Sequence, residues 1–174
     1  MEGMGRIQLY TGCGKGKTTA AVGLTVRLIG RGGTAVFAQF LKGENSGERA
    51  VLACLDGVNL LPVPSEIKFV FQMTSREKEA CAQAARGQFL HACEAAASCD
   101  LLVLDEALDA IETGMLAEDT VLEFLRCKPA ALEVVLTGRR ASDAMKAMAD
   151  YVMRVDSEKH PYEKGLPARA GIEF

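Results

Sequence analysis

Short apolar runs alternate along the chain with longer segments in which apolar residues recur every three or four positions. Most of the short runs are continuously apolar, which is typical of strands that helices cover on both faces. Strands that alternate with helices favour a mostly parallel sheet in an α/β fold. The predicted strands are Ile7–Thr11, Thr34–Phe40, Val58–Leu61, Leu101–Asp105, Glu133–Thr137 and Tyr151–Val155.

Three segments of helical length lie between these strands. The first occupies residues 17–30 and ends at a glycine. The second follows Thr74 and Glu77, which match the capping-box pattern of a helix start. The third begins at Ser142 and extends to about residue 150. The apolar face of the second helix is predicted to contain Cys81, Ala85, Phe89, Ala92 and Ala96.

The composition indicates one folded domain with neither a membrane span nor a nucleic-acid partner. Of the 174 residues, 49% are hydrophobic and 25% are charged, as in an average globular protein. The net charge of −3 argues against nucleic acid as a partner. No apolar run approaches the roughly 18 residues of a membrane span, and the first residues lack the apolar centre of a signal peptide. We therefore expect a cytoplasmic protein in which residues 1–174 form one domain and residues 156–174 a turn-rich C-terminal tail.

A glycine-rich segment follows the first predicted strand. Its glycines would let the backbone curl around a phosphate, with several N–H groups at the start of the next helix. Lys17 would place its ammonium on the phosphates, and Thr18 its hydroxyl on Mg²⁺. The strict P-loop pattern is not met, because Thr11 stands where its first glycine belongs. The predicted phosphate-binding residues are Gly12, Cys13, Gly14, Lys15, Gly16, Lys17, Thr18 and Thr19.

Two later strands end in polar residues that suit a nucleotide site. Leu101–Asp105 is followed by Glu106, and P-loop proteins bring a carboxylate to the metal in this way. Glu133–Thr137 is followed by Gly138 and Arg139, whose guanidinium could complement triphosphate charge. The alternatives are a solvated acidic turn and an exposed arginine pair. Together the motifs predict a single-domain P-loop NTPase-like (RecA-like) α/β fold, a mostly parallel sheet with helices on both faces, that binds Mg²⁺ and a nucleoside triphosphate. They leave open which bond breaks.

The ordered set of motifs resembles the P-loop ATP:corrinoid adenosyltransferases of the CobA/BtuR type over nearly the whole chain. This resemblance implies transfer of the 5′-deoxyadenosyl group of ATP to the cobalt of a reduced corrinoid, with release of triphosphate. It also implies that ATP and cob(I)alamin or a precursor corrinoid are substrates, that a flavoprotein reductase donates electrons, and that the protein is a homodimer. The matching segments are Thr11–Ala21, Gln39–Gly43, Gly47–Arg49, Val103–Glu106, Thr137–Arg139 and Gly171–Phe174.

The resemblance assigns roles to residues at the matching positions. Residues 12–18 would hold the triphosphate, with Lys15 and Lys17 on its oxygens. Thr18 and Glu106 would hold Mg²⁺, and Arg139 would add positive charge. Cys13 departs from the family, whose members often have Asn at this place.

An aromatic pair carries a further expectation from the resemblance. The family has a Phe-x-Trp segment that excludes the lower axial ligand of Co(II) and so eases reduction to Co(I). Phe69 and Phe71 occupy the corresponding place, in a chain without tryptophan. The alternative is that both rings are core residues on one more strand.

Two other functions remain open at this point. A RecA-like ATPase or a small-molecule kinase would use the same acidic pair, and it would release ADP instead of triphosphate. A nucleotide-dependent switch is the third possibility, and it is disfavoured because such switches have a second lysine where this chain has Gly12.

Overall fold

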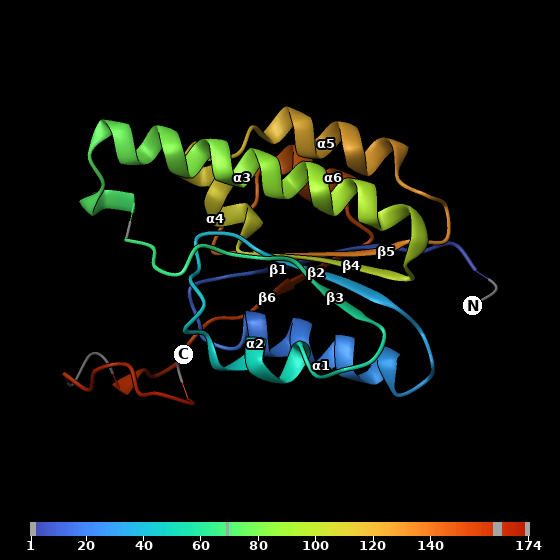
Figure 1. Cartoon of the computed structure of the whole chain (residues 1–174), viewed down its shortest axis with the longest axis horizontal. Helices are drawn as coiled ribbons and strands as arrows, with labels where there is room; N and C mark the ends of the chain where they lie inside the picture. Colours follow the sequence, from blue (N-terminus) through green and yellow to red (C-terminus); the bar gives the residue numbers. More distant parts are fainter. Residues whose placement is uncertain (1–2, 69, 162–164, 173–174) are drawn as a thin grey trace.

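Six strands form one sheet in which every observed pairing is parallel. The computed structural model describes residues 3–68, 70–161 and 165–172. The strand order is β3-β2-β4-β5-β1-β6, and Figure 1 shows the sheet nearly edge-on between two layers of helices. The bounds are β1 (Ile7–Thr11), β2 (Ala35–Gln39), β3 (Val58–Leu60), β4 (Leu101–Asp105), β5 (Glu133–Thr137) and β6 (Tyr151–Arg154).

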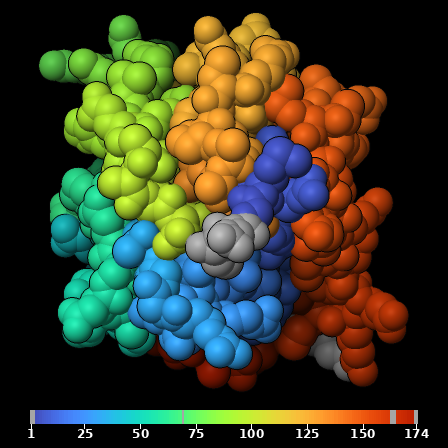
Figure 2. All heavy atoms as spheres, turned by 90° about the vertical axis from the view of Figure 1, so that its right-hand side faces the viewer, coloured from blue at the N-terminus to red at the C-terminus, as the bar shows by residue number. Residues whose placement is uncertain are grey.

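The helices cover both faces of the sheet. One face carries α1 (Lys17–Ile29) and α2 (Gly47–Leu52). Viewed from the side where the chain begins, the α1 layer (blue) and the α3 and α5 layer (green and orange) lie on opposite sides of the molecule (Figure 2). Within the described ranges, none of the helices is long and apolar enough to cross a bilayer. The other face carries α3 (Ser75–Ala95), α4 (Ala107–Glu112), α5 (Glu118–Cys127) and α6 (Asp143–Met148), with short 3₁₀ turns at Val70–Gln72 and Ala96–Ser98.

Alternate residues of each central strand enter two separate apolar cores. Leu102 and Leu104 pack in one core with Phe89 of α3. Leu101 and Val103 pack in the other core, on the α1 side of the sheet. Because both faces of the strand are buried, its sequence is continuously apolar, and the predicted α/β architecture is confirmed.

The buried polar residues mark one edge of the sheet. Parallel strands end at the same edge, so the last side chains of neighbouring strands come together there. β5 lies between β1 and β4, which separates the glycine-rich loop from the acidic strand end by one strand. In the described part of the chain these buried residues are Thr11, Thr25, Gln39, Asp105 and Thr137, and all except Thr25 end a strand.

The predicted elements agree with the observed ones to within one or two residues. The six strands are all present, and the Thr74 capping box starts α3 as expected. The helix after Ser142 ends at Met148, slightly earlier than predicted. The helices α2, α4 and α5 were not predicted from the sequence. The described residues beyond 155 contain no strand and no α-helix.

The glycine-rich loop packs tightly against the end of β6. The N–H of Gly14 donates to the carbonyl of Val155 at 2.8 Å. A Cβ on Gly12 would lie 2.2 Å from the same carbonyl oxygen, and the φ of Gly12 is +107°. A Cβ on Gly14 would lie 2.9 Å from it. These two glycines are therefore required by the neighbouring backbone, whether or not a ligand is bound.

Replacing Gly12 by alanine should destabilise the protein without any nucleotide present. The clash with Val155 and the left-handed backbone together should cost on the order of 2 kcal/mol or more. Gly23→Ala within α1 is the matched control, because a Cβ there meets nothing within 4 Å and should add roughly 0.5–1 kcal/mol. Urea denaturation without nucleotide measures both. Equal stability of Gly12→Ala and the wild type would contradict the packing described here.

Candidate functional site

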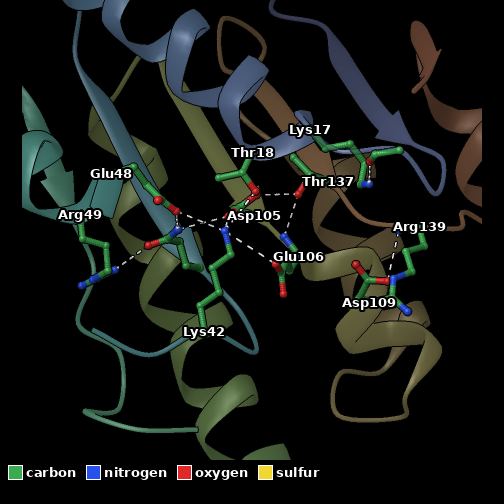
Figure 3. A network of polar contacts seen from close by, with 12 residues as sticks. Lys17, Thr18, Lys42, Glu48, Arg49, Asp105, Glu106, Asp109, Thr137 and Arg139 are labelled. Atoms are coloured by element: carbon green, nitrogen blue, oxygen red, sulfur yellow. Dashed lines mark hydrogen bonds and ion pairs between the residues drawn. The ribbon is translucent and has the colours of Figure 1, made fainter. Parts of the chain in front are cut away.

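A fully buried carboxylate, Asp105 at the end of β4, is the centre of the site. Its Oδ1 accepts hydrogen bonds from the hydroxyls of Thr18 at 2.9 Å and Thr137 at 2.7 Å. Its Oδ2 accepts from Lys42 Nζ at 2.9 Å and Gln39 Nε2 at 3.2 Å. Thr18 reaches Asp105 from α1, Thr137 from the end of β5 and Lys42 from the segment after β2 (Figure 3). Both oxygens of the buried charge are therefore satisfied.

The ammonium of Lys42 lies among several oxygens. It donates to Thr18 Oγ1 at 3.1 Å and to Glu48 Oε1 at 3.2 Å, in addition to its contact with Asp105. Glu106 Oε1 lies 3.7 Å away. Burial alone would lower the pKa of Lys42, but the charges of Asp105, Glu106 and Glu48 outweigh it, so the pKa is raised. Lys42 therefore remains a cation at neutral pH.

Glu106 is held by its backbone and starts α4. Its N–H donates to Thr137 Oγ1 at 2.8 Å, and its φ of 59° is left-handed. Burial raises the pKa of the Glu106 carboxyl to about 7; attraction to Lys42 opposes the rise, and repulsion from Asp105 and Asp109 adds to it. Its side chain is 32% exposed, so this carboxyl, unlike Asp105, can reach a ligand.

The glycine-rich loop leads into the uncapped start of α1. Gly16 is the N-cap, with a φ of 106° and no side-chain cap, and the first turn contains no acidic residue. The free N–H groups of a first turn favour an anion. Lys17 folds back on the loop, where Nζ donates to the carbonyls of Gly12 and Gly14, both at 2.7 Å.

The remaining predicted loop residues lie on its outer side. Cys13, Lys15 and Thr19 are exposed. Lys15 Nζ donates to the carbonyl of Ile172 at 3.3 Å, which brings the C-terminal tail beside the loop. The structure therefore gathers the predicted loop residues in one place, with Lys17 and Thr18 on its inner side.

Arg139 lies in the turn after β5, and its backbone joins the loop. Its carbonyl accepts from the N–H of Gly12 at 2.9 Å, and its own N–H donates to Asp109 Oδ1 at 3.2 Å. The Arg139 residue is exposed. Figure 3 shows Arg139 and Asp109 together, apart from the group around Asp105.

The predicted aromatic pair is described only in part. Phe71 lies in the 3₁₀ turn Val70–Gln72 and is 79% exposed. The alternative interpretation, in which this ring is a core residue on a strand, is wrong for Phe71. Phe69 lies outside the described residues.

Several residues of the polar network around Asp105 were not predicted from the sequence. Arg49 donates to Gln39 Oε1 at 2.9 Å and to the carbonyl of Leu61 at 3.0 Å, which fixes the amide that faces Asp105. The available signal was the polar residue at each strand end, because ligands collect there. The residues that were given no role are Gln39, Lys42, Glu48, Arg49 and Thr137.

The oxygen donors near the loop suit a small hard cation. Mg²⁺ prefers carboxylate, hydroxyl and phosphate oxygens and usually takes only one or two carboxylates from the protein. Thr18 and Glu106 offer such oxygens on either side of Lys42. In the described ranges, no cluster of three or more His, Cys, Asp or Glu side chains could hold a metal by itself.

A parallel sheet with a glycine-rich loop between its first strand and first helix, and a carboxylate two strands away, is consistent with a P-loop NTPase-like domain. The family model described as ATP:corrinoid adenosyltransferase BtuR/CobO/CobP matches residues 3–174. The chain therefore belongs to this family of transferases.

Curated relatives from several bacteria agree with that assignment. A protein of Pseudomonas aeruginosa named corrinoid adenosyltransferase is 32% identical over 171 residues, which cover 98% of this chain and 84% of the relative. Corrinoid adenosyltransferase CobA of Salmonella typhimurium is 32% identical over 174 residues, covering 99% and 87%. A corrinoid adenosyltransferase of a Sinorhizobium species is 30% identical over 172 residues, covering 98% and 80%.

Glu106→Gln should stabilise the metal-free protein at alkaline pH. A carboxyl whose pKa is about 7 in the folded protein, against about 4.3 when unfolded, destabilises the fold as the pH rises through that window. Glutamine mimics the protonated form, so the gain should be on the order of 1 kcal/mol at pH 8, after allowance for partial exposure, and small at pH 4.5. Thermal denaturation in EDTA at both pH values measures it. A loss of stability at pH 8 would mean that the charge of Glu106 is favourable where it lies.

Proposed function

We propose that this protein transfers the 5′-deoxyadenosyl group of ATP to the Co(I) of a reduced corrinoid and releases triphosphate. Membership of the corrinoid adenosyltransferase family supports ATP and a corrinoid as substrates. The observation that carries the proposal is that Lys17, Thr18 and Glu106 all lie around the uncapped start of α1 (Figure 3). That arrangement suits a triphosphate that must be held and neutralised.

The proposed reaction needs positioning and charge neutralisation more than acid–base catalysis. Co(I) donates an electron pair to C5′ of ATP to form the Co–C bond, the bond between C5′ and its oxygen breaks, and triphosphate leaves with the electron pair of that broken bond. No proton is transferred in this step, so no general base is required. Lys17 and the first-turn N–H groups would stabilise the leaving group, and Arg139 would add positive charge at the edge of the loop.

Thr18 and Glu106 are the residues that we propose hold Mg²⁺. Asp105 is less suited, because four donors already occupy its two oxygens. The side chain of Glu106 is 32% exposed, so its carboxyl can reach a ligand. When bound, Mg²⁺ would neutralise part of the triphosphate charge. Asp105 would orient the Thr18 hydroxyl.

Further partners follow from the family and stay proposals. We propose that a flavoprotein reductase supplies the electron that converts Co(II) to Co(I), that the protein acts in the cytoplasm, and that it is a homodimer. Phe71, an aromatic ring on the surface, would cover the lower face of the corrin.

The proposed reaction is tested by its two products. Incubation with ATP, Mg²⁺ and chemically reduced cob(I)alamin should yield light-sensitive adenosylcobalamin and triphosphate in equal amounts, measured by absorbance and by ³¹P NMR. Release of ADP or phosphate without adenosylcobalamin would support a kinase or ATPase instead. Binding of ATP with no turnover of cob(I)alamin would also reject the proposal.

Phe71→Ala should impair the reaction only when reduction is required. If the ring excludes the lower ligand of Co(II), the variant should lose at least tenfold in turnover from cob(II)alamin with a reducing system, and less than threefold from cob(I)alamin. Little stability should be lost, because the side chain is 79% exposed. Leu90→Ala, another exposed apolar residue at 57%, serves as the matched control. Equal losses in both assays would exclude a role in the reduction step.

A further inference from the structure

Lys42 occupies the position that the proposed metal ion needs. Its Nζ contacts Thr18 Oγ1 at 3.1 Å and lies 3.7 Å from Glu106 Oε1, the two groups assigned to Mg²⁺. It also contacts Asp105 Oδ2 at 2.9 Å, beneath them. The side chain is only 17% exposed. The oxygens that would surround the metal therefore surround an ammonium in this structure.

The backbone just before Lys42 has an unusual conformation, which directs this side chain toward the site. Leu41 has a φ of 54°, a left-handed conformation that a branched apolar residue rarely adopts. The preceding residue is fixed, because the N–H of Phe40 donates to the carbonyl of Asp105 at 2.8 Å. In the described ranges, Leu41 and Glu106 are the non-glycine residues with positive φ. Both adjoin this cation and its oxygens.

We propose that Lys42 is a resident cation of the metal site, which neutralises its oxygens until Mg²⁺ arrives with the triphosphate and displaces it. The inference rests on the proposed function, since it assumes a metal–nucleotide substrate. By occupying the site, Lys42 makes the binding of the metal depend on the nucleotide.

Electrostatics gives the reason for this dependence. A free divalent cation would have to bind within a few ångströms of the Lys42 ammonium, and the two repel each other strongly where water is largely excluded. A triphosphate adds several negative charges to the same place. The metal and the nucleotide together can therefore replace the ammonium, whereas the metal alone meets a competitor that is covalently attached.

Glu48 provides a second position for the displaced ammonium. Glu48 Oε1 lies 3.2 Å from Lys42 Nζ, on the opposite side of the ammonium from Glu106 in Figure 3. It is held by Gln39 Nε2 at 2.8 Å. The flexible lysine stem lets the charge shift toward Glu48 while it stays paired.

Manganese binding without nucleotide is the direct test. Mn²⁺ replaces Mg²⁺, and the loss of its free-ion EPR signal measures binding to the wild type, Lys42→Met, Lys42→Arg and the control Lys146→Met, whose lysine pairs with Asp143 on the surface. Lys42→Met should bind Mn²⁺ at least tenfold more tightly than the wild type. Lys42→Arg keeps the charge and should resemble the wild type, as should Lys146→Met. Lys42→Gln, which keeps a donor for Asp105, replaces Lys42→Met if that variant does not fold.

Thermal denaturation gives a second readout. Mg²⁺ alone should raise the melting temperature of Lys42→Met and leave that of the wild type unchanged. If the wild type binds Mn²⁺ without nucleotide as tightly as Lys42→Met, the inference is overturned. A variant that is merely less stable, with no gain in metal binding, would overturn it too, because a structural ion pair predicts that result. Neither measurement uses adenosyl transfer, so failure of the proposed function is detected separately.

Discussion

The site depends on one requirement: a carboxylate that is buried at the end of a central strand must be fully hydrogen-bonded. Removing one partner of a buried charge typically costs about 3–5 kcal/mol. Asp105 meets the requirement with donors from β2, β5, α1 and the segment after β2. Gln39 and Lys42 are close in the sequence, but Thr18 and Thr137 lie in other parts of the chain. Hydrogen bonding of this single charge therefore fixes the relative positions of the glycine-rich loop, Glu106 and Lys42.

The strand order makes that convergence possible and leaves a cost in the backbone. With β5 between β1 and β4, the Thr137 hydroxyl can accept from the Glu106 N–H and donate to Asp105 at once. The chain then has to leave both β2 and β4 sharply, through left-handed residues at Leu41 and Glu106. Backbone strain of this kind persists where surrounding contacts over-determine it, as they do here.

Most of the fold could be predicted because its signals are local. Apolar runs, most of them continuous, identified all six strands, and the capping box at Thr74 identified α3. The helices α4 and α5 were missed because neither start has a side-chain cap: α4 begins at the left-handed Glu106 and α5 after Ala117. Packing of residues such as Val121 and Leu125 against the sheet holds α5 in place instead.

The site could be predicted only where a motif contains its own chemistry. The loop residues and Glu106 follow from strand–glycine–lysine and strand–acid patterns. Lys42 and Gln39 lie in a segment that matches the family, but that segment assigned them no role, because the role arises only when β2 is placed beside β4, which is a long-range event. The role expected of Phe71 came from the family resemblance alone, and the structure adds that its ring is exposed.

The contact between the glycine-rich loop and the end of β6 has a consequence for the thermodynamics of the proposed nucleotide binding. Since Gly12 and Gly14 are already packed on the backbone of Val155, the loop acquires its curvature when the protein folds. The conformational entropy of ordering it is lost at that stage. If a nucleotide binds at this loop as proposed, it meets a preorganised receptor, and less of its intrinsic binding energy is consumed in shaping the loop.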